Sequence, residues 1–253
     1  MTKELKVCLR MFMRTYLMGG CINTRGMQHI GFSYVMEPGL RFLYPVEDDL
    51  QKARKRYLRF VNTHPCWVPF LIGLFFSIER KIHKGLIPPK SLLKMKGTLA
   101  CTLSAVGDSL FGGSIYVFWS LSTMLFLSQG LHGLAWAWAL GWIILLEGFK
   151  AYTFWQGMTQ GLPFLARVKS WNLMGWAGRI KVVNACLLVL FWGSIWPDPS
   201  HLACWVAGSC GMLFVGWLAS FSCRIREVML LILFVLFVVI PWVWPYLTRP
   251  YAG

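Results

Sequence analysis

The feature that most constrains the fold is a run of 53 residues, 97–149, that contains no lysine or arginine. Basic residues cluster outside it, with eleven in residues 1–64 and six in residues 79–96. A helix that spans a bilayer needs about 20 mostly apolar residues, and the basic residues gather in the loops that flank it. The pattern therefore predicts an integral membrane protein.

The composition supports this interpretation and excludes other classes. Charged residues make up 14% of the 253 residues, whereas soluble domains usually contain about 25%. The net charge of +15 is segregated along the chain as in membrane proteins, so we expect no nucleic-acid partner. The eight cysteines and five histidines lack metal-site spacing, and no hydrolytic or nucleotide-binding motif occurs. We expect no metal, no cofactor and no catalytic residues.

Residues 1–65 are expected to form a cytoplasmic or interfacial region of amphipathic helices. The periodicity predicts helices over 4–18, over 26–44 with a break near Pro38-Gly39, and over 48–60 with Asp48 or Asp49 as N-cap. Met1 to Arg14 has no signal-peptide pattern, so we expect the N-terminus to remain in place and in the cytoplasm.

Residues 66–127 are expected to contain a short segment and a broken helix. Residues 66–78 are apolar but too few to cross the bilayer, and basic residues flank both ends, which favours a re-entrant segment. Residues 98–127 are about a third longer than one span needs, and Gly107, Gly112 and Gly113 interrupt them around Asp108.

Residues 128–253 are expected to supply the other transmembrane helices, over 131–146, 182–196, 202–221 and 228–243. With the broken helix they make about five spans, so the expected fold is an all-α polytopic membrane helix bundle. The links at 128–131 and 197–201 contain no lysine or arginine and should lie outside, together with the tail 244–253. The basic stretches 150–181 and 223–226 should lie inside.

Ionisable residues within the apolar segments are the first candidates for function. A charged group at membrane depth needs a partner or water, so Asp108 either lines a hydrated cavity or caps a half-helix. Glu147 stands three residues before Lys150, a spacing that favours a plain ion pair on one helical face.

Two further polar clusters stand near the amino-terminal helices. Asn62, Thr63 and His64 precede Pro65, which is suited to the first helical position. They form either a sugar-binding cluster or a structural cap. Asn23, Arg25 and Gln28 open another helix, and taken alone they indicate a cap with surface charge.

The order of several motifs over about residues 8–113 resembles the IID subunit of mannose/fructose/sorbose-family phosphotransferase (PTS) permeases. These motifs are Asn23 with Met27-Gln28, Gly31-Phe32, Leu43-Tyr44, Asn62-Thr63-His64-Pro65, Ile72-Gly73, Glu79 and Gly107-Asp108-Ser109-Leu110-Phe111.

The resemblance implies a non-catalytic subunit in a bacterial inner membrane. It would pair with a IIC subunit in a hetero-oligomer surrounded by lipid, and translocate a sugar that IIB phosphorylates after receiving the phosphoryl group from IIA. We expect the substrate-binding residues to be Asn23, Arg25, Gln28, Asn62, Thr63, His64 and Asp108.

The sequence also departs from the family pattern. Ile22 and Thr24 stand where the family has aromatic residues, Arg25 where it has an acid, and Gly112 where it has tryptophan. Arg25 suits either an anionic or more polar sugar or an ion pair with Glu79 or Asp108. One alternative is therefore a IID-like scaffold or sensor that has lost sugar transport. Another is a membrane enzyme that acts on lipid.

Overall fold

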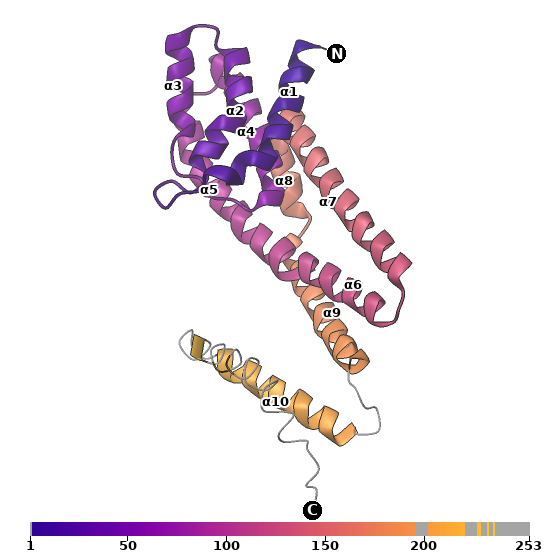
Figure 1. The fold of residues 1–253 in the computed structure, drawn as a ribbon. Coiled ribbons are helices and arrows are strands. Elements are labelled where there is room, and N and C mark those ends of the chain that lie inside the picture. Colours follow the sequence, from indigo (N-terminus) through magenta and orange to yellow (C-terminus); the bar gives the residue numbers. More distant parts are fainter. Residues whose placement is uncertain (1, 196–201, 221–226, 229–231, 233–234, 236–253) are drawn as a thin grey trace, which may run out of the picture. The chain divides into compact units, whose positions relative to one another are not determined.

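The computed structural model describes residues 2–195, 202–220, 227–228, 232 and 235 (Figure 1). It divides into two compact units, residues 1–194 and 195–253, and each is considered by itself. The described residues are helical apart from turns, short links and two isolated bridges, Asn23 with Met27 and Met27 with Val61. The expected all-α fold is confirmed.

The amino-terminal helices form as the amphipathic pattern predicts. They are α1 (Lys3–Arg14), the 3-10 helix η1 (Thr15–Cys21), α2 (His29–Leu43) and α3 (Glu47–Tyr57). Val46 occupies the N-cap of α3, so the prediction that Asp48 or Asp49 caps this helix was wrong. Both acids lie in its first turn instead, where the helix dipole favours negative charge.

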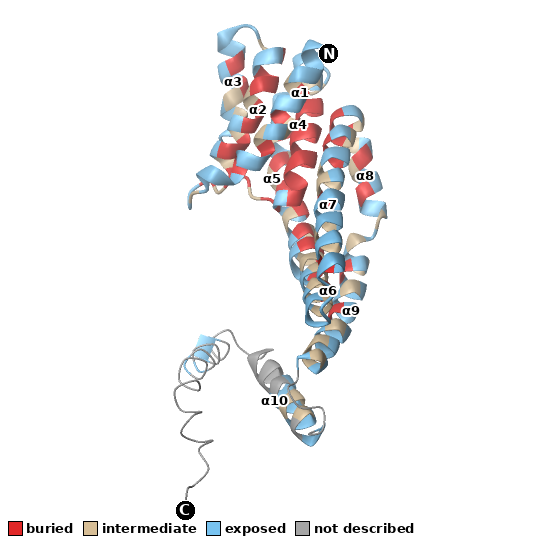
Figure 2. Ribbon diagram, turned by 45° about the vertical axis from the view of Figure 1, so that its right-hand side comes forward, coloured by how far each residue is buried: buried red, intermediate tan, exposed pale blue. Residues whose placement is uncertain are grey.

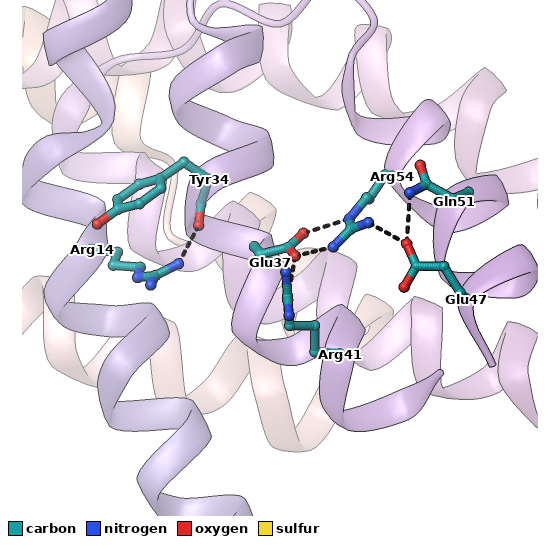
Figure 3. A network of polar contacts seen from close by, with 7 residues as sticks. All are labelled: Arg14, Tyr34, Glu37, Arg41, Glu47, Gln51 and Arg54. Atoms are coloured by element: carbon teal, nitrogen blue, oxygen red, sulfur yellow. Dashed lines mark hydrogen bonds and ion pairs between the residues drawn. The ribbon is translucent and has the colours of Figure 1, made fainter. Parts of the chain in front are cut away.

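The predicted break at Pro38 does not occur, because α2 continues through this residue. Proline has no N–H, so the carbonyl oxygen of Tyr34, four residues earlier, loses its helical donor. The Nη1 atom of Arg14 donates to that oxygen at 3.0 Å, and the Arg14 guanidinium lies 4.2 Å from the centroid of the Tyr34 ring (Figure 3). A donor from α1 thus replaces the missing hydrogen bond.

An ion-pair cluster holds α2 against α3 (Figure 3). The Nη2 and Nε atoms of Arg54 lie 2.5 and 3.0 Å from the two carboxylate oxygens of Glu37, and its Nη1 lies 2.9 Å from Oε1 of Glu47. Arg41 also pairs with Glu37 at 2.6 Å. The hydrogen bonds from Arg54 lower the pKa of Glu37.

The core of the first unit surrounds α4 (Val68–His83), which follows the short 3-10 helix η2 (Pro65–Trp67). Residues 68–79 are all buried, whereas much of α6, α7 and α9 is exposed (Figure 2). Buried Glu79 accepts hydrogen bonds from Tyr44 (2.8 Å), Tyr57 (2.7 Å) and Arg56. This carboxylate joins α2 and α3 to α4.

Lysine 96 provides a second buried polar link, which the sequence did not indicate. Its side chain is 2% exposed, and Nζ donates to the carbonyl oxygens of Tyr57 and Arg59 at 3.0 Å each. These carbonyls lie at and just beyond the carboxyl end of α3, where a cation complements the helix dipole.

The segment 89–128 is one continuous helical stretch. It consists of α5 (Pro89–Gly107), the π-helix η3 (Asp108–Ile115) and α6 (Tyr116–Ser128). The break expected near Asp108 is therefore a change of helical type, with Gly107 and Asp108 in the right-handed helical region. π-helical segments recur at functional sites.

The next helices are longer than their apolar cores suggested. They are α7 (His132–Gln160), α8 (Leu162–Ser170) and α9 (Leu173–Ser194), with Gly161 at φ 64° between α7 and α8. Gly73 and Gly157 let α4 and α7 pack backbone to backbone. A Cβ on Gly157 would lie 2.8 Å from the carbonyl oxygen of Phe70.

Three helical stretches among the described residues are long and apolar enough to cross a membrane: 89–128, 132–160 and 162–194. They contain the first predicted span and most of the second and third. In the second unit, α10 (Leu202–Ser220) covers most of the fourth. The fifth, 228–243, falls largely outside the described residues, and so does the tail 244–253.

Candidate substrate and partner site

Gln28 brings the two predicted polar clusters together. Its Nε2 donates to the carbonyl oxygen of Thr63 at 3.0 Å, and the Thr63 backbone N–H donates to its Oε1 at 3.0 Å. Both residues are buried. The hydroxyl oxygen of Thr63 has no hydrogen-bond partner among the described residues. The Gln28 amide therefore fixes the backbone of the second cluster.

Asn23 and Arg25 lie in the turn before α2. The Asn23 side chain accepts from the backbone N–H groups of Arg25 (3.1 Å) and Gly26 (2.9 Å). The Arg25 side chain is exposed, and the described residues give it no ion pair with Glu79 or Asp108. Glu79 is already occupied by Arg56, as described above, so the possible pairing of Arg25 with Glu79 does not form.

His64 caps η2, while Asn62 lies half-buried beside it. The Nδ1 atom of His64 accepts from the Cys66 N–H at 3.3 Å, and the imidazole stacks on Phe111 with centroids 5.3 Å apart. Burial lowers the pKa of His64, which favours the neutral ring that this acceptor role requires. A structural cap is therefore present, as one of the two sequence interpretations predicted. Gly107 gives the imidazole room against α5.

Asp108 is on η3, where its charge acts on the nearby His64 imidazole, but no hydrogen bond joins it to these residues within the described part of the chain. It is exposed, and its nearest described partner is the Ser104 hydroxyl, at 3.5 Å from Oδ2. Next to it, the exposed Lys181 on α9 donates to the Ser109 hydroxyl at 3.3 Å. A buried bond from Asn184 Nδ2 to the Ser114 carbonyl oxygen, 2.9 Å, fixes α9 against η3.

Two exposed glycines lie near these charged residues in the chain: Gly112, four residues after Asp108, and Gly178, three residues before Lys181. A Cβ on Gly112 of η3 or on Gly178 of α9 would meet nothing within 4 Å. We call the surface formed by Asp108, Gly112, Gly178 and Lys181 the Asp108 face. Small residues allow a second helix to approach closely in a membrane, and charged groups there require a partner or water.

A third polar group joins η1 to α7. The Tyr16 hydroxyl donates to Glu147, and Lys150 Nζ donates to Oε1 of Glu147 at 2.7 Å. The predicted Glu147–Lys150 pair is thereby confirmed. Tyr16 was missed as a site residue, since 131 residues separate it from Glu147 and the sequence indicated it only as part of the helix over 4–18. Burial and the bond to Glu147 raise the pKa of Tyr16 to about 12.

The Tyr16 side chain borders a pocket of about 250 Å³, which we call the Tyr16 pocket. Segments from η1, the turn before α2, the start of α4 and α7 converge on it. Its lining residues are Thr15, Tyr16, Met18, Gly19, Ile22, Gln28, Pro65, Val68, Pro69 and Lys150. Gln28 is the one predicted site residue among them.

Known proteins match most of this first unit. The family model of the PTS system mannose/fructose/sorbose family IID component matches residues 4–183. The PTS system mannose-specific EIID component of Escherichia coli (strain K12) is 33% identical over 125 residues, which are 48% of this chain and 44% of that protein. The Fructose permease IID component of Bacillus subtilis (strain 168) is 30% identical over 159 residues, 62% of this chain and 56% of that protein. The chain thus spans about half the length of the curated relatives it matches.

Solved structures share the fold. One, described as a cryoEM structure of mannose transporter ManYZ in complex with microcin E492, has a TM-score of 0.55 at 18% identity, over 97% of both chains. Another, described as a membrane protein, has a TM-score of 0.63 at 21% identity, over 76% of this chain and 70% of the other. With its three apolar stretches, the chain is a multi-pass membrane protein. Because the family model covers well over half of the 253 residues, the chain belongs to the mannose/fructose/sorbose family of PTS IID components.

Proposed function

We propose that the chain pairs through the Asp108 face with a IIC-type membrane subunit, and that the two translocate a sugar which a IIB protein then phosphorylates. The observation that carries the proposal is the exposure of Asp108 and Lys181 on stretches otherwise suited to lipid. Relatives named for mannose, fructose and sorbose favour a hexose as the substrate class.

The depth of Asp108 supports a protein or hydrated neighbour over lipid. It follows Lys96 by 12 residues, about 18 Å along a helix. The hydrocarbon core is about 30 Å thick, so a helix that enters the bilayer near Lys96 places Asp108 inside it. An aspartate there costs about 2.5–3.5 kcal/mol against lipid. A partner with polar groups, or a hydrated path between the two subunits, removes this cost.

The open glycines favour a helix as the neighbour. Gly112 and Gly178 leave the backbone of η3 and α9 uncovered, and small residues at such positions are typical of closely packed membrane helices. Because Asp108 and Lys181 carry opposite charges, the face can discriminate partners by their polar groups.

We further propose an orientation of the chain in the membrane. The amino-terminal helices and the stretch from Lys150 to Lys169 are rich in basic residues, which favours the cytoplasmic side of a bacterial inner membrane. The surface of α1–α3 would then face the IIA and IIB proteins.

The test is co-purification of the IIC-type partner with Gly112→Leu. In this chain a leucine Cβ at position 112 meets nothing within 4 Å, so the chain should fold while the added side chain obstructs the partner. Gly141→Leu on α7 is the matched control, since Gly141 is also exposed, helical and open. We expect Gly112→Leu to lose the partner and Gly141→Leu to retain it. Equal recovery with both variants would contradict the proposed interface.

A second candidate function is a IID-like scaffold or sensor without transport. Exposed Ile22 and Arg25, where the family has an aromatic residue and an acid, favour it. The two candidates differ in sugar uptake by membranes that contain the assembled complex. Uptake lowered by Asp108→Asn, at equal amounts of complex, supports transport. A parent complex that assembles but takes up none of the three sugars supports the scaffold.

A further inference from the structure

We propose that the Tyr16 pocket binds a neutral sugar through its hydroxyl groups, as a subsite on the cytoplasmic side of the membrane. The inference rests on the proposed function and adds a location and a ligand class to it. Apart from Gln28, the residues that carry it, Tyr16, Gly19, Glu147 and Lys150, are not among the predicted substrate-binding residues.

The pocket combines aromatic, apolar and polar lining residues. Half-exposed Tyr16 lines it together with apolar residues, namely Ile22 and, at the start of α4, Val68 and Pro69. Sites for small molecules typically combine apolar and aromatic walls with a few placed polar groups. A sugar ring presents both apolar C–H faces and hydroxyl groups, so it matches such a pocket.

Polar groups in and beside the pocket have hydrogen-bond donors and acceptors that remain unused. The Lys150 ammonium has three donors, one of which is directed to Glu147. Glu147 does not line the pocket itself, but it is bonded to the lining residues Tyr16 and Lys150. Its carboxylate accepts one bond on each oxygen and has further lone pairs, and its side chain is 41% exposed. Gln28 keeps one N–H and one lone pair after bonding Thr63. Donors and acceptors of this kind pair with adjacent hydroxyl groups, which both donate and accept.

The balance of charge at the pocket favours a neutral ligand over an anion. Lys150 is the charged residue that lines the pocket, and its bond to Glu147 balances it. An anionic ligand would have to compete with Glu147 for the ammonium, whereas a neutral polyol can bond both groups and leave the ion pair intact. The pocket therefore favours the sugar before phosphorylation over the sugar phosphate.

Gly19 offers a test that leaves the fold intact. It lines the pocket, and a Cβ at this position meets nothing within 4 Å. Gly19→Leu therefore fills the pocket without pressing on a neighbour. Gly20→Leu is the matched control, because Gly20 is equally open in the same 3-10 helix but does not line the pocket.

The measurement is isothermal titration calorimetry of the purified complex with its membrane partner, using mannose, fructose and sorbose and, as competitor, mannose 6-phosphate. We expect Gly19→Leu to weaken binding of the preferred sugar about tenfold or more, Gly20→Leu to bind as the parent does, and the phosphate to compete poorly. Parent-like affinity of Gly19→Leu would overturn the pocket assignment and leave the proposed function standing. A parent complex that binds none of the sugars would contradict the proposed function, and the pocket with it.

Discussion

Removing the Glu79 carboxylate should destabilise the amino-terminal half of the chain strongly. Its side chain is 0% exposed and is shared by Tyr44, Tyr57 and Arg56, whose own side chain is 11% exposed. In Glu79→Ala the arginine keeps its charge in a buried place without a counter-ion. Breaking a buried pair in this way costs about 3–5 kcal/mol. For a chain of this size, about 2–4 °C per kcal/mol gives a fall in Tm of roughly 6–20 °C.

The assay is thermal unfolding of the full chain in detergent, followed by tryptophan fluorescence. Glu4→Ala is the control, because Glu4 also pairs with an arginine of α4, Arg80, at 2.7 Å but with side chains 47% and 32% exposed. An exposed pair contributes about 0–1 kcal/mol, so Tm should fall by at most a few degrees. Similar shifts in the two variants would refute the argument that Glu79 organises the core.

Three further perturbations test separate contacts. Gly157→Ala should lower the free energy of unfolding by about 1–3 kcal/mol, because the added Cβ would meet the α4 backbone. Gly148→Ala should not lower it, since nothing lies within 4 Å of a Cβ there. Chemical unfolding of both variants checks this. The pKa of Glu37 is lowered in the fold, so its contribution is present above the unfolded value of about 4.3 and is lost as pH falls through the lower folded pKa. Glu37→Gln should flatten the Tm–pH curve in that acid range, and an unchanged slope would contradict the role of Arg54. The pKa of His64 is lowered too, so stability should decline as pH falls below about 6.5, and a decline that persists in His64→Gln would assign the effect elsewhere.

Local features of the fold could be predicted because their causes lie within a few residues. Helical periodicity predicted the amino-terminal helices, the lack of charge predicted the spans, and spacing predicted the Glu147–Lys150 pair. His64 caps η2 and Pro65 is its first residue, as expected because a proline suits the first helical position. These interactions need no knowledge of tertiary structure.

The errors arose where a distant residue supplied the missing partner. Pro38 indicated a break, but Arg14 replaces the lost donor from another helix. The glycines around Asp108 indicated an interruption, and the chain instead keeps its helical path as a π-helix that packs against α9. Tyr16 could not be recognised as a site residue without the fold that brings it to Glu147.

The most direct test of the account is phosphoryl transfer to sugar in membrane vesicles. Vesicles that contain the chain and its IIC-type partner, supplied with phosphorylated IIB, should convert external mannose, fructose or sorbose to the sugar phosphate inside. Omitting the chain should abolish conversion, and Asp108→Asn should lower it at equal amounts of complex. Conversion at the full rate with the partner alone would contradict the claim that this chain forms part of the sugar path.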